Sequence, residues 1–350
     1  MTSQHAWEDT FARDPLGRLV PPMFHRLLML DVLRPPDRAA VRRLETVLQR
    51  VERRHPRGPA GLLMLLGWGP GYFARYTDWR PPVPRPIAMS RDEHPVLDDF
   101  DACLHLAADS QARLDALVLK LFDTDAPSLT AVLRLREVRC GCVGAGLPAQ
   151  LAGGGIPPNS PLLLGFHSGL RRNQATEAEV TIPAGPLAGG TTMHVSRLAL
   201  DVNRWYDHDP ETRAALMFAP TVSSNEAATL SEDAPSDFDR LPSTVRAYGV
   251  VGHAQAAARA RLNGRPRLNR RDFATIDDGI PGTHFVSLQR SIEDFNATRA
   301  VMNAADARHH HRSVGLRRNN GINAFMDVLR RATFAVPPHA QRSFPGIARG

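Results

Sequence analysis

The chain has 350 residues, 43% hydrophobic and 23% charged, so it is long enough for one or two folded domains and too apolar for global disorder. Its net charge of +7 comes almost wholly from arginines scattered among acidic residues, with few aromatic residues between them, which argues against nucleic-acid binding. Three cysteines do not suggest a disulfide framework, and a polar N-terminus with no apolar run long enough to span a bilayer predicts a cytoplasmic protein without membrane contact.

The first part of the sequence alternates signals for strands and helices. Apolar runs predict strands over residues 24–33, 61–67, 101–107 and 130–138. Helical periodicity predicts helices over residues 38–54, directly after Pro35-Pro36-Asp37, and 110–122. The resulting order, β-α-β-β-α-β, is the ferredoxin-like pattern.

A Gly- and Pro-rich stretch, residues 144–161, reads as a linker or a site loop, and the same rhythm begins again after it. Alternating residues predict strands over 191–202 and 283–290, separated by a long insertion. A helix is expected from Ser291, and the last elements are predicted as a helix over 322–331 and a strand over 332–336.

Two such units in tandem predict an α+β fold of the dimeric α/β-barrel type, in which antiparallel sheets with flanking helices form a common core. We expect an N-terminal ferredoxin-like domain over residues 20–150 and a C-terminal one over residues 160–345.

Three features of the second part follow one another in a suggestive order. A turn, Gly165-Phe-His-Ser-Gly169, comes directly after the apolar run Pro161-Leu-Leu-Leu164. His253 follows Val250-Val-Gly, and an arginine cluster, Arg267-Leu-Asn-Arg-Arg-Asp272, lies beyond it. This combination resembles the haem site of the dye-decolorising peroxidases, and weaker similarities extend the resemblance over nearly the whole chain.

The resemblance implies a double ferredoxin-like fold with haem b in the C-terminal domain. It implies a haem-dependent oxidoreductase that uses peroxide or a related oxidant on a small organic substrate, and it makes a homo-oligomer an expectation as well. His253 matches the family's axial ligand to the haem iron, a role that a neutral imidazole can fill.

Other positions carry expectations from the same resemblance. Arg270 matches the distal arginine, whose guanidinium would stabilise the departing oxygen of peroxide, although Arg271 or Arg267 could fill that place. Asp272 could orient this arginine or end a turn. Asp327 is the expected hydrogen-bond acceptor for the second nitrogen of His253.

A haem also needs residues that bind its propionate carboxylates and backbone that lies close to its ring. Arg197 and Asn173 are candidates to bind a haem propionate, because guanidinium and amide groups donate hydrogen bonds to carboxylates. Gly165 and Gly169, which bound the turn, would let the backbone approach the cofactor closely.

Ser168 departs from the family pattern, since the family's turn reads Gly-x-x-Asp-Gly. A serine hydroxyl is too weakly basic to replace an aspartate that accepts and returns a proton. His167 could supply a base if it faces the pocket, although neighbouring residues of an extended segment point opposite ways. Three interpretations stay open: a peroxidase-like enzyme with altered distal chemistry, a haem-dependent dehydratase or lyase acting on a nitrogen–oxygen bond, and a non-catalytic haem-binding protein.

Overall fold

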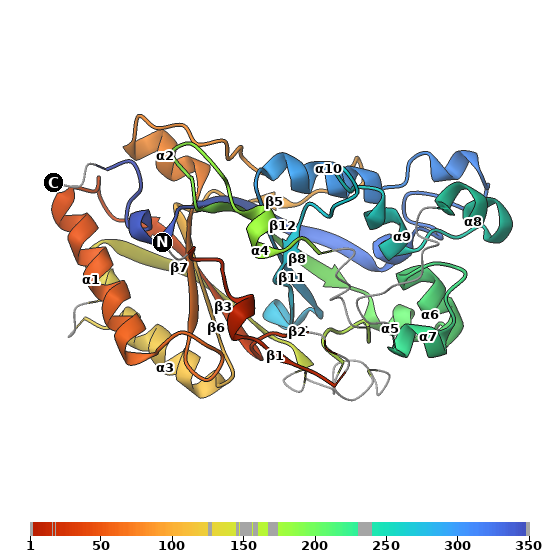
Figure 1. The fold of residues 1–350 in the computed structure, drawn as a ribbon, viewed down its shortest axis with the longest axis horizontal. Helices are drawn as coiled ribbons and strands as arrows, with labels where there is room; N and C mark the ends of the chain where they lie inside the picture. The colour runs from red at the N-terminus through yellow and green to blue at the C-terminus, as the bar shows by residue number, and fades with distance from the viewer. Residues whose placement is uncertain are drawn as a thin grey trace.

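A computed structural model of the chain describes residues 3–15, 17, 19–124, 128–144, 147, 156, 160–166, 174–229 and 240–347. Within these ranges the fold is built around one ten-stranded sheet, with helices on its outer surface (Figure 1). A separate two-stranded sheet pairs β1 (Ala12–Arg13) with β2 (Leu19–Val20).

The first half contributes four long strands in the spatial order β7-β3-β6-β4, all antiparallel. The strands are β3 (Phe24–Val32), β4 (Leu63–Trp68), β6 (Ala102–Ala108) and β7 (Leu133–Cys142), and the short β5 is Val96–Leu97. The helices are α1 (Arg38–Arg54), α2 (Pro70–Tyr76) and α3 (Gln111–Leu121).

The second half repeats this arrangement, in the order β12-β8-β11 followed by β9 and β10. The strands are β8 (Thr191–Leu200), β9 (Asn269–Arg270), β10 (Phe273–Thr275), β11 (Gly282–Gln289) and β12 (Met326–Val336). The helices are α4 (Glu177–Val180), α5 (Val202–Tyr206), α6 (Pro210–Met217), α7 (Ser224–Thr229), α8 (Leu241–Tyr248), α9 (His253–Ala258) and α10 (Ile292–Met302).

The two sets of strands close into a barrel. Strand β4 of the first half pairs with β12 of the second, while β10 pairs with both β7 and β11. Closure removes the free strand edges that an open sheet would expose. The α+β fold of antiparallel strands with flanking helices is therefore as predicted, whereas the domain limits 20–150 and 160–345 stay a prediction, because one continuous sheet joins both halves.

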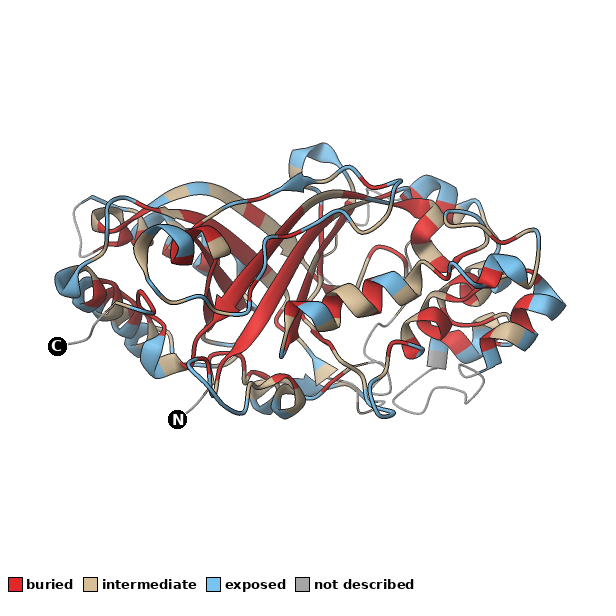
Figure 2. Ribbon diagram, turned by 90° about the horizontal axis from the view of Figure 1, so that it is seen from above, coloured by how far each residue is buried: buried red, intermediate tan, exposed pale blue. Residues whose placement is uncertain are grey.

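The barrel has a packed interior to which both halves contribute. Apolar side chains that alternate along the strands point inward and are almost completely buried, among them Leu27, Met29, Leu65, Met193, Val195, Val286 and Phe334. Figure 2 shows the strands as largely buried, with exposed residues gathered on the outer helix faces and loops. The interior is thus a hydrophobic core rather than a binding site.

The outer faces of the two halves are covered differently. In the first half, α1 packs Val41, Leu44 and Leu48 onto strand residues such as Leu28 and Leu30. The side chain of Asp37 caps this helix by accepting a hydrogen bond from the Ala40 amide at 2.8 Å, as the sequence predicts. In the second half, α10 lies over the strands β8 and β11, and the short helices α5 to α9 lie toward the end of the molecule opposite α1 (Figure 1). A large cavity remains there.

One predicted element is wrong. The segment expected as a helix over 322–331 is a short 3-10 helix, Gly321–Phe325, followed by the single long strand β12. Its pairing with β8 over ten residue pairs, which continues across a bulge between Val328 and Arg330, outweighs the local helical periodicity. In the part of the chain that is described, no helix has the length and apolar character that crossing a membrane requires.

Candidate functional site

The cavity lies between the outer face of strands β8, β11 and β12 and the helices α6, α9 and α10. It contains about 1480 Å³ of space that no protein atom fills, part of it open to solvent. Its apolar wall includes Leu162, Leu164, Phe166, Leu198, Leu200, Met217, Phe218, Phe285, Phe295, Met302, Ile322, Met326 and Val328.

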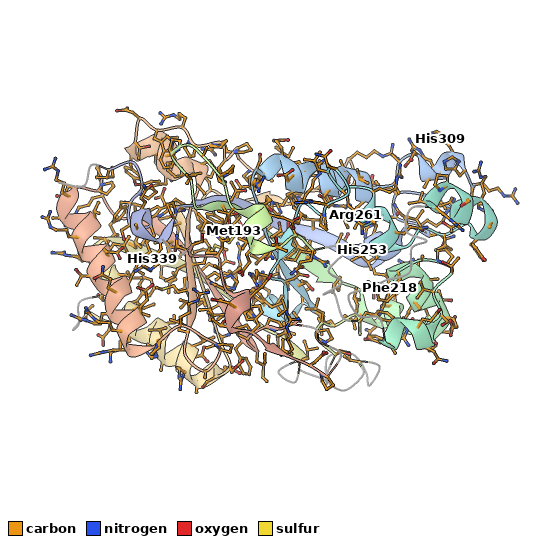
Figure 3. The ribbon with its side chains drawn as sticks, in the orientation of Figure 1. Met193, Phe218, His253, Arg261, His309 and His339 are labelled. Atoms are coloured by element: carbon orange, nitrogen blue, oxygen red, sulfur yellow. The ribbon has the colours of Figure 1, made fainter. Side chains whose placement is uncertain are left out.

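Among the described residues that line this wall, His253 is the one histidine, and it is half-buried. Figure 3 shows it close to Arg261 and Phe218, which also line the cavity, whereas His339 lies at the opposite end of the molecule. Burial, together with the positive charges of Arg270 and Arg299, lowers the pKa of His253 to about 3. Its imidazole is therefore neutral at physiological pH.

Close packing on both sides fixes the start of α9. At Gly252 a β-carbon would lie 2.0 Å from the carbonyl oxygen of Phe218, so a larger residue does not fit. The side chain of the buried Gln255 donates from Nε2 to Thr244 Oγ1 at 2.7 Å, and its backbone N–H donates to the Phe218 carbonyl at 3.2 Å. The small residues Ala254 and Ala257 beside His253 leave the cavity open.

The arginine cluster is divided by the alternation of an extended chain. Arg270 and Asp272 line the cavity, whereas Arg271 between them points to the other side. There the Arg271 guanidinium pairs with Glu177 and lies over the ring of Trp7, at 5.4 Å from its centroid. The backbone is held in place because the Arg271 amide donates to the Val286 carbonyl at 2.7 Å.

The cavity carries more positive than negative charge. Arg299 on α10 and Arg331 on β12 share one carboxylate, Glu93, at 2.9 and 2.8 Å. Arg267 pairs with Asp294 at 3.1 Å. Arg261 and Arg270 also line the wall, on which Asp272 is the acidic residue among those described. Such a cavity favours a ligand that is largely apolar and carries negative charge at its edge.

The sequence matches the model of a family described as a family of unknown function, DUF7405, over residues 22–338. The chain belongs to this family. No curated protein matches it. Because the function of the DUF7405 family is unknown, membership alone does not indicate what this chain does.

Solved structures share the fold over nearly the whole chain. A DyP-type peroxidase from Cellulomonas bogoriensis is 21% identical, with a TM-score of 0.64 over 94% of this chain and 93% of that one. The encapsulated DyP-type peroxidase from Mycobacterium smegmatis is 16% identical, with a TM-score of 0.65 over 95% and 98%. A DypB variant from Rhodococcus jostii in complex with heme is 15% identical, with a TM-score of 0.62 over 93% and 96%. At these identities the likeness establishes the fold.

The DUF7405 structure brings some of the predicted site residues together. His253 and Arg270 both line the cavity, and so does Arg267, one of the alternatives to Arg270. Gly165 ends a turn in which its amide donates to the Leu162 carbonyl at 3.0 Å, and its φ is positive, at 85°. The next residue, Phe166, lines the cavity. The predictions for His167, Ser168, Gly169 and Asn173 fall outside the described residues.

Other predicted residues lie elsewhere. Arg197 is not part of the cavity wall, because its guanidinium donates to the carbonyl of Leu198 on β8 and to the carbonyls of Asp277 and Ile280 in the turn before β11. Arg271 faces away from the cavity, as described above. The structure therefore does not support either arginine as a partner for a cofactor in the cavity.

The expected partner of His253 is a further correction. Asp327 is an exposed residue of β12 that pairs with Arg317 at 2.5 Å, so it does not orient the imidazole. No described residue accepts a hydrogen bond from the His253 ring.

The sequence interpretation missed Arg299, Arg331 and Glu93. Arg299 occupies one face of α10, and Arg331 joins the cavity face of β12 because the bulge after Val328 changes the alternation. Glu93 comes from a loop of the first half, more than 200 residues away.

Proposed function

We propose that this protein binds haem b in the cavity and acts as an oxidoreductase similar to the dye-decolorising peroxidases, reducing peroxide at the expense of a small organic donor. The observation that carries the proposal is the presence of His253 and Arg270 on one large, mainly apolar wall. The fold shared with DyP-type peroxidases over nearly the whole chain supports it.

The residues present fit such a cofactor. A porphyrin is flat and apolar with carboxylates at one edge, and the wall combines apolar side chains with arginines. His253, neutral because of its lowered pKa, would ligate the iron, and Ala254 and Ala257 would let the ring approach. Arg299 and Arg331, with one carboxylate between them, have positive charge left to bind a propionate.

A bound haem would supply the iron at which peroxide is reduced and the donor oxidised. The chain's own residues would do the rest. The apolar side chains of the wall would keep water from the surfaces that a bound haem covers, which would strengthen electrostatic interactions there. Arg270 would stabilise negative charge on the oxygen that leaves when the O–O bond breaks, through donors fixed before the reaction.

A titration of the purified protein with haemin tests the proposal. We expect a Soret band that saturates at one haem per chain, and a change of this band when one equivalent of hydrogen peroxide is added. The substitution His253→Ala should weaken haemin binding at least tenfold, which corresponds to about 1.4 kcal/mol.

The matched control is His309→Ala, which changes an exposed histidine and should leave the titration unchanged. Equal haem content in both variants would contradict the assignment of His253. Saturable binding without any response to peroxide would favour a haem-binding protein or a haem-dependent dehydratase instead.

A further inference from the structure

Asp272 is an acidic side chain on the apolar cavity wall. Its Oδ1 atom is buried and has no hydrogen-bond partner in the described part of the chain. An unpaired buried carboxylate oxygen costs free energy, because the protein does not replace the hydrogen bonds that water would make. This cost is removed when a ligand donates a hydrogen bond to the oxygen or a proton binds to it.

The backbone directs this side chain into the cavity from both sides. Before it, the Arg271 amide is bonded to β11. After it, Phe273 is completely buried in the barrel, where its ring stacks on His25 at 4.6 Å between centroids. Since residues 271 and 273 are anchored on the opposite face, Asp272 cannot turn away without breaking these contacts.

Arg270 lies on the same face, two residues before Asp272. Its positive charge favours the ionised carboxylate, but burial dominates and raises the pKa of Asp272 above its usual value. No ion pair links Asp272 with any described residue, so none of these residues neutralises its carboxylate. The other titratable or charged groups on the described wall are His253 and arginines 261, 267, 299 and 331.

We propose that Asp272 is the proton-exchanging group of this cavity, taking a proton from a bound peroxide and returning it to the leaving oxygen. The inference rests on the proposed function and adds a catalytic residue to it. It assigns to Asp272 the acid–base role for which the hydroxyl of Ser168 is unsuited.

The proton and electron balance is simple. Hydrogen peroxide gives one proton to an Asp272 oxygen, so a peroxide O–H bond breaks and a carboxyl O–H bond forms. When the O–O bond breaks, the carboxyl returns this proton to the departing oxygen, whose charge Arg270 stabilises. Overall H₂O₂ and a reduced organic donor DH₂ give two water molecules and the oxidised donor D, and Asp272 ends ionised as it began.

The test compares Asp272→Asn with the parent protein, both loaded with haemin. The amide keeps the size of the carboxylate but exchanges no proton. We expect an unchanged haemin titration and a rate of reaction with peroxide that is at least 100-fold lower, since general acid–base catalysis typically contributes about 10²–10⁴-fold. The parent rate should rise with pH as Asp272 ionises, and this rise should be absent from the variant.

The matched control is Asp278→Asn, which changes an exposed aspartate outside the cavity. Its rate and pH profile should equal those of the parent. Loss of haemin binding in Asp272→Asn, or a rate equal to that of the control, would overturn the assignment.

A second measurement does not depend on haem. In protein labelled with ¹³C at the aspartate carboxyl carbons, one signal should disappear in Asp272→Asn. In the parent, the pKa read from this signal should lie clearly above the ordinary aspartate value of about 3.9. A pKa at or below this ordinary value would overturn the inference even in haem-free protein. Failure of the proposed function would show separately, as a parent protein without a saturable Soret band.

Discussion

Gly321 packs directly against the main chain of His253. A β-carbon at Gly321 would lie 2.9 Å from the Cα atom of His253 and 3.0 Å from its Cβ atom and amide nitrogen. The Gly321 amide also donates to the carbonyl of Val251 at 2.7 Å, and its φ of +54° is in the left-handed region. The position of the histidine thus depends on a glycine in the segment that leads into β12.

We predict that Gly321→Ala moves the start of α9. The added methyl group overlaps His253, and alanine is strained at a positive φ by about 1–2 kcal/mol. Haemin affinity should fall at least tenfold, and the free energy of unfolding should fall by about 2 kcal/mol or more. A haemin titration and urea unfolding measure the two effects.

Gly279→Ala is the control, because Gly279 has a φ of +71° but no atom within 4 Å of the added carbon. It should show the backbone strain without the loss of haemin affinity. If both variants bound haemin equally well, contact with Gly321 would not determine where His253 lies.

A second prediction concerns Glu93, the carboxylate that Arg299 and Arg331 share. Burial alone would raise the pKa of Glu93, but the two guanidinium groups hold it below its usual value, so the group is ionised at neutral pH. Glu93→Gln should destabilise the free protein by about 3–5 kcal/mol, because it leaves two largely buried cations without their counter-charge.

The same variant should bind an anionic ligand more tightly, since more positive charge then faces the cavity. Urea unfolding with and without haemin measures both effects, and Asp92→Asn serves as the control at a neighbouring exposed residue, with an expected change within about 0.5 kcal/mol. A Glu93→Gln protein as stable as the parent would show that this carboxylate does not balance the two arginines.

The sequence predicted the barrel well because local signals and tertiary packing agree over most of it. The strand over 24–33 and the helix over 38–54 have the alternation and capping that the structure uses. The last strand was predicted only over 332–336, whereas residues 326–331 were expected to be helical. The pairing that decides their conformation comes from β8, more than 100 residues earlier.

The site was only partly predictable. His253 and Arg270 stood out because glycine and arginine neighbours mark them in the sequence. Arg197 and Arg271 looked equally suitable, and a single-residue alternation that depends on strand register turns them away from the cavity. The pairing of Glu93 with Arg331 joins the two halves and has no local signal at all.

A third prediction concerns stability in acid. His25 is fully buried, donates from Nε2 to the Pro22 carbonyl at 2.9 Å, and lies with Nδ1 at 3.0 Å from His105 Nε2. Burial lowers the pKa of His25 to about 3. Between pH 6.5 and 3 the unfolded chain therefore binds a proton that the folded chain does not, so stability is lost as the pH falls through this window.

For this one group the loss should amount to about 1.4 kcal/mol per pH unit, or about 3 kcal/mol at pH 4. Urea unfolding between pH 7.5 and 4.5 should show a smaller slope in His25→Gln than in the parent. His309→Gln, at an exposed position, should keep the parent slope. Identical slopes in all three proteins would mean that His25 does not contribute to acid sensitivity.

The last prediction comes from the departure at Ser168 in the sequence. Ser168→Asp should raise the rate of peroxide consumption by the haemin-loaded protein at least tenfold at unchanged haem content, because a carboxylate accepts a proton that a serine hydroxyl does not. Ser168→Asn controls for size and polarity without adding a base. The gain should be larger in an Asp272→Asn background, where the new carboxylate would replace the missing proton acceptor. Equal rates for Ser168→Asp and Ser168→Asn in the Asp272→Asn background, with haem retained, would mean that a carboxylate at position 168 takes no part in peroxide chemistry.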